Sequence, residues 1–148
     1  MTAHHDPAET PARLEGRATW QVSRMHTRVS RLLGAAFDAD GDGLRSYHYR
    51  LLAALEQGGP MTQAELGRRT AIDRSDVTGA LGELETRGLV TRTADPTHGR
   101  RKIVELTPDG ATRLGELDAV IDGVQEDFLA PLTPAQRRQF LDLAARLT

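Results

Sequence analysis

Residues that could contact nucleic acid gather in the stretch 61–102. This stretch contains eight Lys or Arg residues and six Asp or Glu residues, which gives it a formal charge of +2. Because the whole chain carries −2, the remainder carries −4. A basic stretch inside an acidic chain is compatible with contact to DNA phosphates, although so small an excess of charge does not establish it.

A predicted helix from Asp73 to Arg87 presents two different faces. One has the spacing of a buried apolar stripe, with Val77, Ala80, Leu81 and Leu84. The other lacks the long charged side chains of an ordinary solvated face and consists of Ser75, Thr78, Gly79, Gly82 and Thr86. Each interior glycine costs about 1 kcal/mol relative to alanine, and a helix that must lie close to the floor of a DNA groove would explain both. The alternative is a weakly stable surface helix.

A basic β-hairpin is expected next. Strand patterns over 89–93 and 101–106 flank the turn Asp95-Pro96-Thr97-His98-Gly99. Arg100 therefore lies at or near the hairpin tip. An arginine in that place can enter a DNA minor groove, whose negative potential is strongest when the groove is narrow. The alternative for a lone arginine is a solvated turn charge.

Start and stop signals define three short helices that position these residues. Ser46 is the expected cap of the first helix, Thr62 of the second and Asp73 of the third. Glu65 lies three residues after Thr62 and would complete a capping box. Gly88 is expected to end the third helix. Two helices followed by the groove-facing one are thus expected ahead of the hairpin.

Longer helices flank this middle region. Residues 14–37 place apolar side chains at intervals of three and four, in a stripe that is wide for one helix. Thr107-Pro108 and Thr133-Pro134 mark the starts of two further helices, because proline favours the first helical position. These helices carry more apolar surface than one small core can cover. Pairing with a second copy of the chain is therefore expected.

Two stretches of the sequence resemble the MarR family of bacterial transcription regulators. The segment DPTHGRRKIVELTPDG (95–110) is similar to that family's wing, and IDRSDVTGALGELETRGLV (72–90) is similar to its recognition helix. The resemblance runs from about Trp20 to the C-terminus. It implies a homodimeric repressor on a pseudo-palindromic operator, often released by a small ligand.

The expected fold class is mainly α with a small β-hairpin wing. A winged helix-turn-helix domain would carry N- and C-terminal dimerisation helices. We expect a disordered tail over 1–13 and a single domain over 14–148, with its DNA-binding lobe at 46–106. The dimerisation helices are expected at 14–37 and 108–147.

The resemblance also assigns contacts to double-stranded DNA. Two residues at a helix N-terminus would meet phosphates, four on the recognition helix would face the major groove, and two lie on the wing, the first of them expected in the minor groove. In chain order they are Thr62, Gln63, Arg74, Ser75, Thr78, Gly79, Arg100 and Arg101.

The wing departs from the family pattern at one position. The family commonly has an acid two residues before the wing arginine, where this chain has His98. Asp95 could take over the role of holding Arg100, the wing could be less fixed, or the histidine could add pH-dependent charge. The simplest interpretation is a tolerated loop substitution.

An effector site is implied between the dimerisation helices and the DNA-binding lobe. A small aromatic or phenolic molecule is the expected ligand, and the side chains suited to it are Trp20, His26, Tyr47 and His48. The ordinary alternative is that each satisfies its polar atoms with backbone or water. Zinc bound through His26 and His48 is a further alternative that no ligand spacing supports.

Several classes of site and activity are disfavoured. The absence of cysteine excludes disulfides and cysteine-ligated zinc. The acidic segment 38–43 matches the first half of a calcium loop, but Tyr49 stands where a bidentate glutamate is needed, so the segment is interpreted as a helix terminator. No nucleophile lies near a base at a meaningful spacing, so neither an enzyme nor a cofactor is expected.

Location and the remaining alternative follow from what the chain lacks. No apolar run approaches the roughly 18–20 residues of a membrane span, and no signal-peptide core is present, so a cytoplasmic protein without membrane contact is expected. A winged-helix module used only for protein contacts is the alternative to DNA binding. It would show no salt-dependent affinity for DNA.

Overall fold

The computed structural model describes residues 10–148. Most of the expected tail therefore lies outside the described residues. Within them, the chain is mainly α with one small antiparallel sheet, as expected. The elements are α1 (Ala18–Asp40), α2 (Ser46–Gly58), β1 (Met61–Thr62), α3 (Gln63–Thr70), α4 (Arg74–Thr86), β2 (Val90–Asp95), β3 (His98–Leu106), α5 (Pro108–Leu129) and α6 (Pro134–Ala145).

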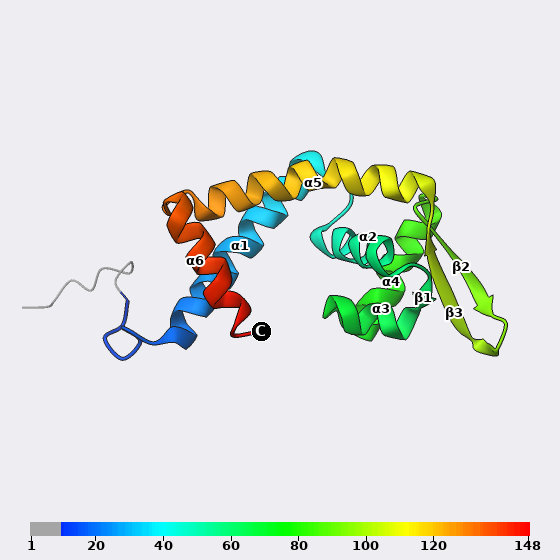
Figure 1. Ribbon diagram of the computed structural model, residues 1–148, viewed down its shortest axis with the longest axis horizontal. Coiled ribbons are helices and arrows are strands. Elements are labelled where there is room, and N and C mark those ends of the chain that lie inside the picture. Colours follow the sequence, from blue (N-terminus) through cyan, green and yellow to red (C-terminus); the bar gives the residue numbers. More distant parts are fainter. Residues whose placement is uncertain (1–9) are drawn as a thin grey trace, which may run out of the picture.

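The elements form two ends joined by one long helix (Figure 1). Helix α5 runs along the top of the molecule. At one of its ends lie α1 and α6, which we call the helical end. At the other end α2, α3, α4 and the sheet form a compact lobe, which we call the DNA-binding lobe. The helical end and the DNA-binding lobe lie on the same side of α5.

The main hydrophobic core lies in the DNA-binding lobe. The predicted apolar stripe of the Asp73–Arg87 helix is buried, which confirms that face of the prediction. Because burying one such side chain contributes roughly 1.5–3 kcal/mol, this packing fixes α4 in the lobe. The core takes Leu51, Leu52 and Leu55 from α2, Leu66 from α3, Leu81 and Leu84 from α4, Val104 from β3, Leu117 from α5 and Phe37 from α1.

Helix α1 differs from the prediction at both ends. It begins at Ala18 rather than residue 14 and continues to Asp40, three residues beyond the predicted end at 37. The acidic segment thus contributes its first three residues to the helix. Two of its acids pair with arginines: Asp38 with Arg45, and Asp42 with Arg113 at 3.3 Å. These cations occupy the carboxylates that a calcium ion would need.

The caps of the three short helices follow the predictions only in part. Thr62 caps α3 by accepting a hydrogen bond from the Glu65 backbone N–H at 3.2 Å, as expected. The Glu65 carboxylate, however, pairs with Arg69 at 2.8 Å instead of completing a capping box. Asp73 stands at the N-cap of α4 but makes no side-chain cap bond, and the cap of α2 is Arg45 rather than Ser46.

The sheet is larger than the predicted hairpin. Its strand order is β1-β3-β2, and the short β1, with Met61 opposite Val104, was not predicted. Two residues are too few to show a period in the sequence. The wing strands extend beyond the predicted ranges, so that only Pro96 and Thr97 lie between β2 and β3.

The start of α5 agrees with its predicted signals. Thr107 accepts a hydrogen bond from the Gly110 backbone N–H at 3.0 Å and donates one to the Gly88 carbonyl at 2.7 Å. Gly110 itself permits a close approach, because a Cβ there would lie 2.1 Å from the Leu89 carbonyl oxygen. Helix α5 is thus anchored directly to the segment that joins α4 to the wing.

Candidate nucleic-acid interface

The face of α4 opposite its buried stripe is open. Ser75, Thr78, Gly79 and Thr86 are exposed, and Gly82 is half-buried. A Cβ placed on Gly79 would meet no atom within 4 Å, and one on Gly82 would meet only the Arg92 guanidinium at 3.9 Å. Packing within the chain therefore does not require either glycine. The space above them is available to a molecule that lies flat on the helix.

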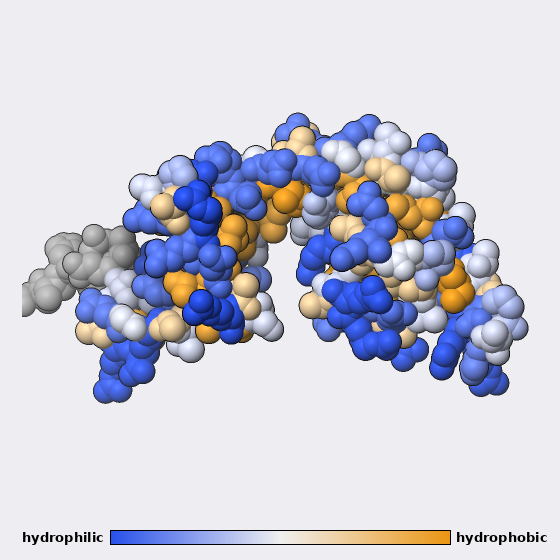
Figure 2. All heavy atoms as spheres, viewed as in Figure 1, coloured by the Kyte–Doolittle hydropathy of each residue, from blue (hydrophilic) through white to orange (hydrophobic). Residues whose placement is uncertain are grey.

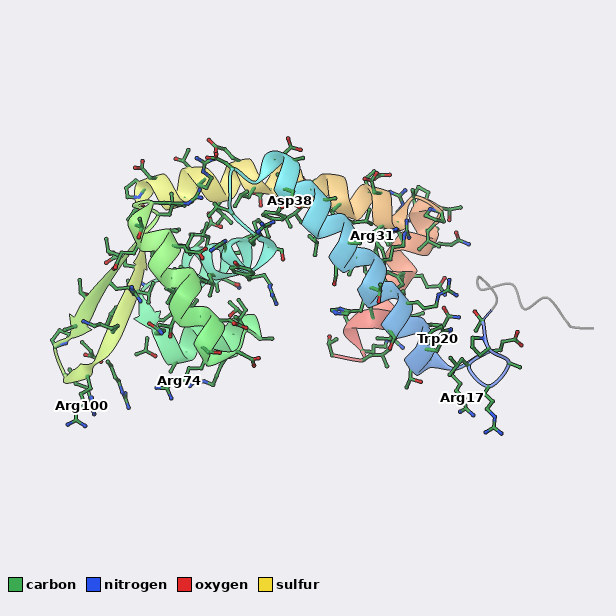
Figure 3. All side chains as sticks on the ribbon, turned by 180° about the vertical axis from the view of Figure 1, so that it is seen from behind. Arg17, Trp20, Arg31, Asp38, Arg74 and Arg100 are labelled. Atoms are coloured by element: carbon green, nitrogen blue, oxygen red, sulfur yellow. The ribbon has the colours of Figure 1, made fainter. Side chains whose placement is uncertain are left out.

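Arg74 begins α4 and is exposed to solvent. Its side chain makes no hydrogen bond or ion pair with any described residue. Figure 3 shows Arg74 and Arg100 along the same edge of the DNA-binding lobe, one at the start of α4 and the other on the wing. Two unneutralised guanidinium groups thus lie on one side of the molecule, as binding of a polyanion requires.

Gln63 and Thr78, both predicted to contact DNA, also contact each other. The Gln63 Nε2 amide donates a hydrogen bond to the Thr78 hydroxyl at 2.7 Å. That hydroxyl also lies 3.2 Å from the Arg74 carbonyl oxygen, to which it donates. This bridge fixes the N-terminus of α3 against the outer face of α4. Thr62 accepts the bond that caps α3 through its hydroxyl oxygen, which leaves the hydroxyl proton free to donate to a phosphate.

The tip of the wing is held by Asp95. Its carboxylate accepts hydrogen bonds from the Thr97 backbone N–H at 2.9 Å and from the Thr97 hydroxyl at 2.8 Å. These two bonds lower the pKa of Asp95, with a smaller contribution from Arg101. Asp95 therefore holds the turn through Thr97 and does not bind Arg100. The role of holding Arg100, one of those considered for Asp95 from the sequence, is not seen. Arg100 is exposed and makes no hydrogen bond or ion pair among the described residues.

Comparison with known proteins identifies the class of this site. The model of the MarR family matches residues 42–101, which include α3, α4 and the wing up to Arg101. The repressor NicR of Pseudomonas putida is 34% identical over 104 residues, 70% of this chain and 66% of that protein. A probable transcriptional regulator from Pseudomonas aeruginosa has a similar structure, with a TM-score of 0.79 and 32% identity over 91% of this chain and 99% of that one.

This protein belongs to the MarR family. It is a DNA-binding transcription regulator and not an enzyme. A third similar protein is the regulator PcaV from Streptomyces coelicolor, whose structure was solved in complex with its natural ligand. The TM-score to it is 0.77 at 26% identity, with 94% of this chain and 96% of that chain covered.

The wing is held against α4 by a residue pair that the sequence did not reveal. The Glu85 carboxylate near the end of α4 accepts bonds from the Arg92 backbone N–H at 3.1 Å and from its guanidinium at 3.2 Å. The Arg92 side chain is the largest cause of a lowered pKa at Glu85. Arg92 is therefore neutralised within the lobe. It positions the wing instead of adding charge for DNA.

A second set of contacts joins α2 to α4. His48 is completely buried, its Nδ1 accepts a hydrogen bond from the Arg45 backbone N–H at 2.9 Å, and its Nε2 lies 2.7 Å from a Glu83 carboxylate oxygen. Burial is the main reason that the pKa of His48 is lowered, and the Arg87 and Arg45 charges act in the same direction against the pull of Glu83. A ring that accepts at Nδ1 carries its proton on Nε2, facing Glu83. The neutral His48 thus ties α2 to α4.

The four side chains expected near an effector do not gather in one place: the ring centroids of Tyr47 and His48 are 4.4 Å apart, but Trp20 and His26 lie elsewhere. Trp20 lies in a groove of about 870 Å³ at the helical end, together with Arg28, Phe128 and Phe140. Tyr47 lines a separate groove of about 520 Å³ beside the start of α4. His48 is buried in the core, and His26 is exposed on α1. The set remains a prediction as an effector site.

Residues 10–148 contain neither a group of metal ligands nor a membrane-spanning helix. Among residues 10–148, no three His, Cys, Asp or Glu side chains are grouped so that they could bind a metal ion. The Nδ1 of His48 accepts from the Arg45 backbone N–H, and its Nε2 lies 2.7 Å from a Glu83 carboxylate oxygen. In the same part of the chain, no helix has the length and apolar character needed to cross a membrane.

Proposed function

We propose that this regulator is a homodimeric repressor that binds a pseudo-palindromic operator. The observation that carries the proposal is the open face of α4 on the same edge as Arg100 (Figure 3). Ser75, Thr78 and Gly79 would enter the major groove, and Arg100 the adjacent minor groove. Arg101, next to Arg100 on the wing, and Gln63, at the N-terminus of α3, would contact phosphates.

The helical end supports a dimer. Among the residues of α6, the structure shows none that is buried, and Leu141 and Leu143 are each half exposed. Leu147, just beyond α6, is 83% exposed, and Val22 of α1 is 54% exposed. Figure 2 shows hydrophobic side chains at the surface of this end. A second copy of the chain would cover them, and closed two-fold pairing is the commonest arrangement of identical chains.

A small aromatic or phenolic effector would release the repressor from DNA. The support is the natural ligand bound to PcaV and the two grooves that contain Trp20 and Tyr47. The Tyr47 groove also includes Ser75 and Gly79, so a molecule in it would occupy surface that the DNA needs. Trp20 is the one tryptophan of the sequence, so its fluorescence reports directly on the other groove.

The effector is tested by screening phenolic acids for release of bound DNA. A compound that releases DNA and changes Trp20 fluorescence binds at the helical end. A compound that releases DNA without that change, and loses its effect in a Tyr47→Ala variant, binds beside α4. If no aromatic or phenolic compound changes DNA binding or thermal stability, the effector proposal is wrong.

DNA recognition is tested by selecting bound sequences from a random pool. We expect a palindrome with half-sites about one helical turn apart, or a multiple of it, because each half-site would receive one recognition helix. Affinity should fall steeply as salt rises, since bound arginines displace counterions from DNA. A protein-contact module would select no sequence and show no such salt dependence.

A further inference from the structure

The hydrogen bonds of Thr78 limit what this residue can recognise. A hydroxyl group has one proton and two lone pairs. The proton is donated to the Arg74 carbonyl, and one lone pair accepts from Gln63 Nε2. If the Gln63 amide were turned over, the proton would go to its carbonyl oxygen instead. In either orientation the proton is used within the protein.

This arrangement excludes one kind of base contact. The acceptors in the major groove, such as guanine O6 and N7 or thymine O4, require a donor from the protein. Thr78 has no proton left to give them. What it can still offer to a base is its methyl group, together with one lone pair that could accept from an amino group.

The surroundings of Thr78 leave that methyl group accessible. The residue is exposed and is followed by Gly79, which has no side chain to cover it. Ser75 and Gly82, one helical turn away on either side, are also small. These small neighbours do not cover the exposed side chain of Thr78. Among the four bases only thymine presents a methyl group in the major groove.

We propose that Thr78 recognises the C5-methyl group of one thymine in each operator half-site, because its hydroxyl proton is held by the Arg74 carbonyl. The inference rests on the proposed placement of α4 in the major groove. Thr78 is thus a specificity-determining residue that reads by apolar contact.

The test replaces each thymine of the selected operator in turn by deoxyuridine, which removes only the methyl group. At one thymine per half-site we expect the affinity of the natural protein to fall about fourfold, the effect of one buried methyl group. Thr78→Val keeps a methyl group and loses the hydroxyl. It should retain that penalty and bind the thymine operator with affinity within a few-fold of the natural protein.

Thr78→Ser keeps the hydroxyl and loses the methyl group. It should bind the thymine operator about fourfold more weakly for each half-site, which is about sixteenfold for the dimer, and show no further loss with deoxyuridine at that position. Because Thr78 is exposed, both variants should melt near the temperature of the natural protein. This check excludes unfolding as the cause.

Three results would overturn the inference. They are a natural protein indifferent to deoxyuridine at every thymine, a Thr78→Ser variant that keeps the full penalty, and a Thr78→Val variant that no longer prefers thymine. The last would mean that the hydroxyl reads the base. Failure of the underlying function is distinguishable, because the natural protein would then show no salt-dependent, sequence-selective binding to DNA at all.

Discussion

The DNA-binding lobe and the helical end differ in how much of their apolar surface a single chain buries. The DNA-binding lobe surrounds a closed core in which leucines of α2, α3 and α4 are fully buried. At the helical end, α6 buries no residue, and side chains such as Leu143 stay half exposed. The same long helix, α5, contributes Leu117 to the core of the lobe and Phe128 to the open groove at the helical end.

The difference indicates a division of tasks. The lobe can fold and present its recognition helix with the residues of one chain. The helical end exposes the kind of surface that usually serves association. We infer that a second copy completes it and that α5 sets the spacing between two recognition helices. Changes in the lobe should then affect stability or DNA contact, whereas changes at the helical end should affect assembly.

The largest effect is expected in the core of the lobe. Leu81→Ala removes a fully buried side chain of α4 and should lower the free energy of unfolding by about 2–5 kcal/mol. Leu147→Ala at the exposed end of the chain is the matched control, and at a protein concentration low enough to keep the chain monomeric it should change this free energy by less than about 0.5 kcal/mol. Urea denaturation measures both. Equal effects would remove the contrast between the two ends.

Assembly should respond to a charge on α6. Leu141→Asp places a carboxylate in the expected dimer interface and should weaken dimerisation by about 2 kcal/mol or more, with the fold of the lobe preserved. Thr112→Asp, on the exposed part of α5, adds the same charge without removing apolar surface. Sedimentation equilibrium compares the two variants. If Leu141→Asp left the association constant unchanged, the helical end would not be the dimer interface.

DNA affinity should depend strongly on the wing. Arg100→Ala should weaken operator binding by about 1–3 kcal/mol and reduce its salt dependence without destabilising the protein, because the exposed Arg100 side chain makes no hydrogen bond or ion pair with residues 10–148. Arg13→Ala removes an exposed arginine that precedes α1 and lines neither groove, and it is the control for net charge. A gel-shift titration measures both. Unchanged affinity of Arg100→Ala would count against the assignment of the wing.

Gly79→Ala should separate stability from function. Alanine should stabilise the interior of α4 by about 1 kcal/mol, since its Cβ meets no atom of the chain, and should weaken DNA binding by filling the space that the groove floor needs. Gly115→Ala on the exposed face of α5 should stabilise the protein without affecting DNA binding. Thermal melts and titrations decide. A Gly79→Ala variant that bound DNA normally would mean that α4 does not lie close to the groove.

The smallest effect is a pH dependence from His48. Its pKa in the folded protein lies below the ordinary value of 6.5, so the unfolded chain binds the proton more readily. Neutral His48 therefore contributes fully to the free energy of unfolding above pH 6.5. This contribution is lost as the pH falls toward the folded-state pKa, and the free energy of unfolding changes by no more than about 1.4 kcal/mol per pH unit. His48→Gln should flatten this slope in urea denaturation at several pH values. An unchanged slope in His48→Gln would exclude this role.

Much of the fold could be predicted because its signals are local. The Thr107-Pro108 and Thr133-Pro134 starts located α5 and α6 correctly, and the apolar spacing of α4 predicted its buried stripe. The contacts that brace the interface could not be predicted in this way. The pair His48–Glu83 joins residues far apart in the sequence, and Glu85 finds Arg92 only once the chain has turned back at Gly88.

The candidate site, like the fold, was predicted only in part from the sequence. Composition located the open stripe of α4, because the missing long side chains are visible in the sequence. The role of Asp95 was not visible, since whether its carboxylate reaches Arg100 or Thr97 depends on turn geometry. Nor could the sequence place Trp20 and Tyr47 in separate grooves, because that depends on the angle between α1 and the lobe.

The most direct test of the account is the mass of the complex with the selected operator, measured by native mass spectrometry. We predict two chains on each duplex, on half-sites about 10 base pairs apart or a multiple of this. Under the same conditions, Leu141→Asp should shift the population toward free DNA. A complex of one chain per duplex at full affinity would contradict the claim that a second copy completes the helical end and supplies the second recognition helix.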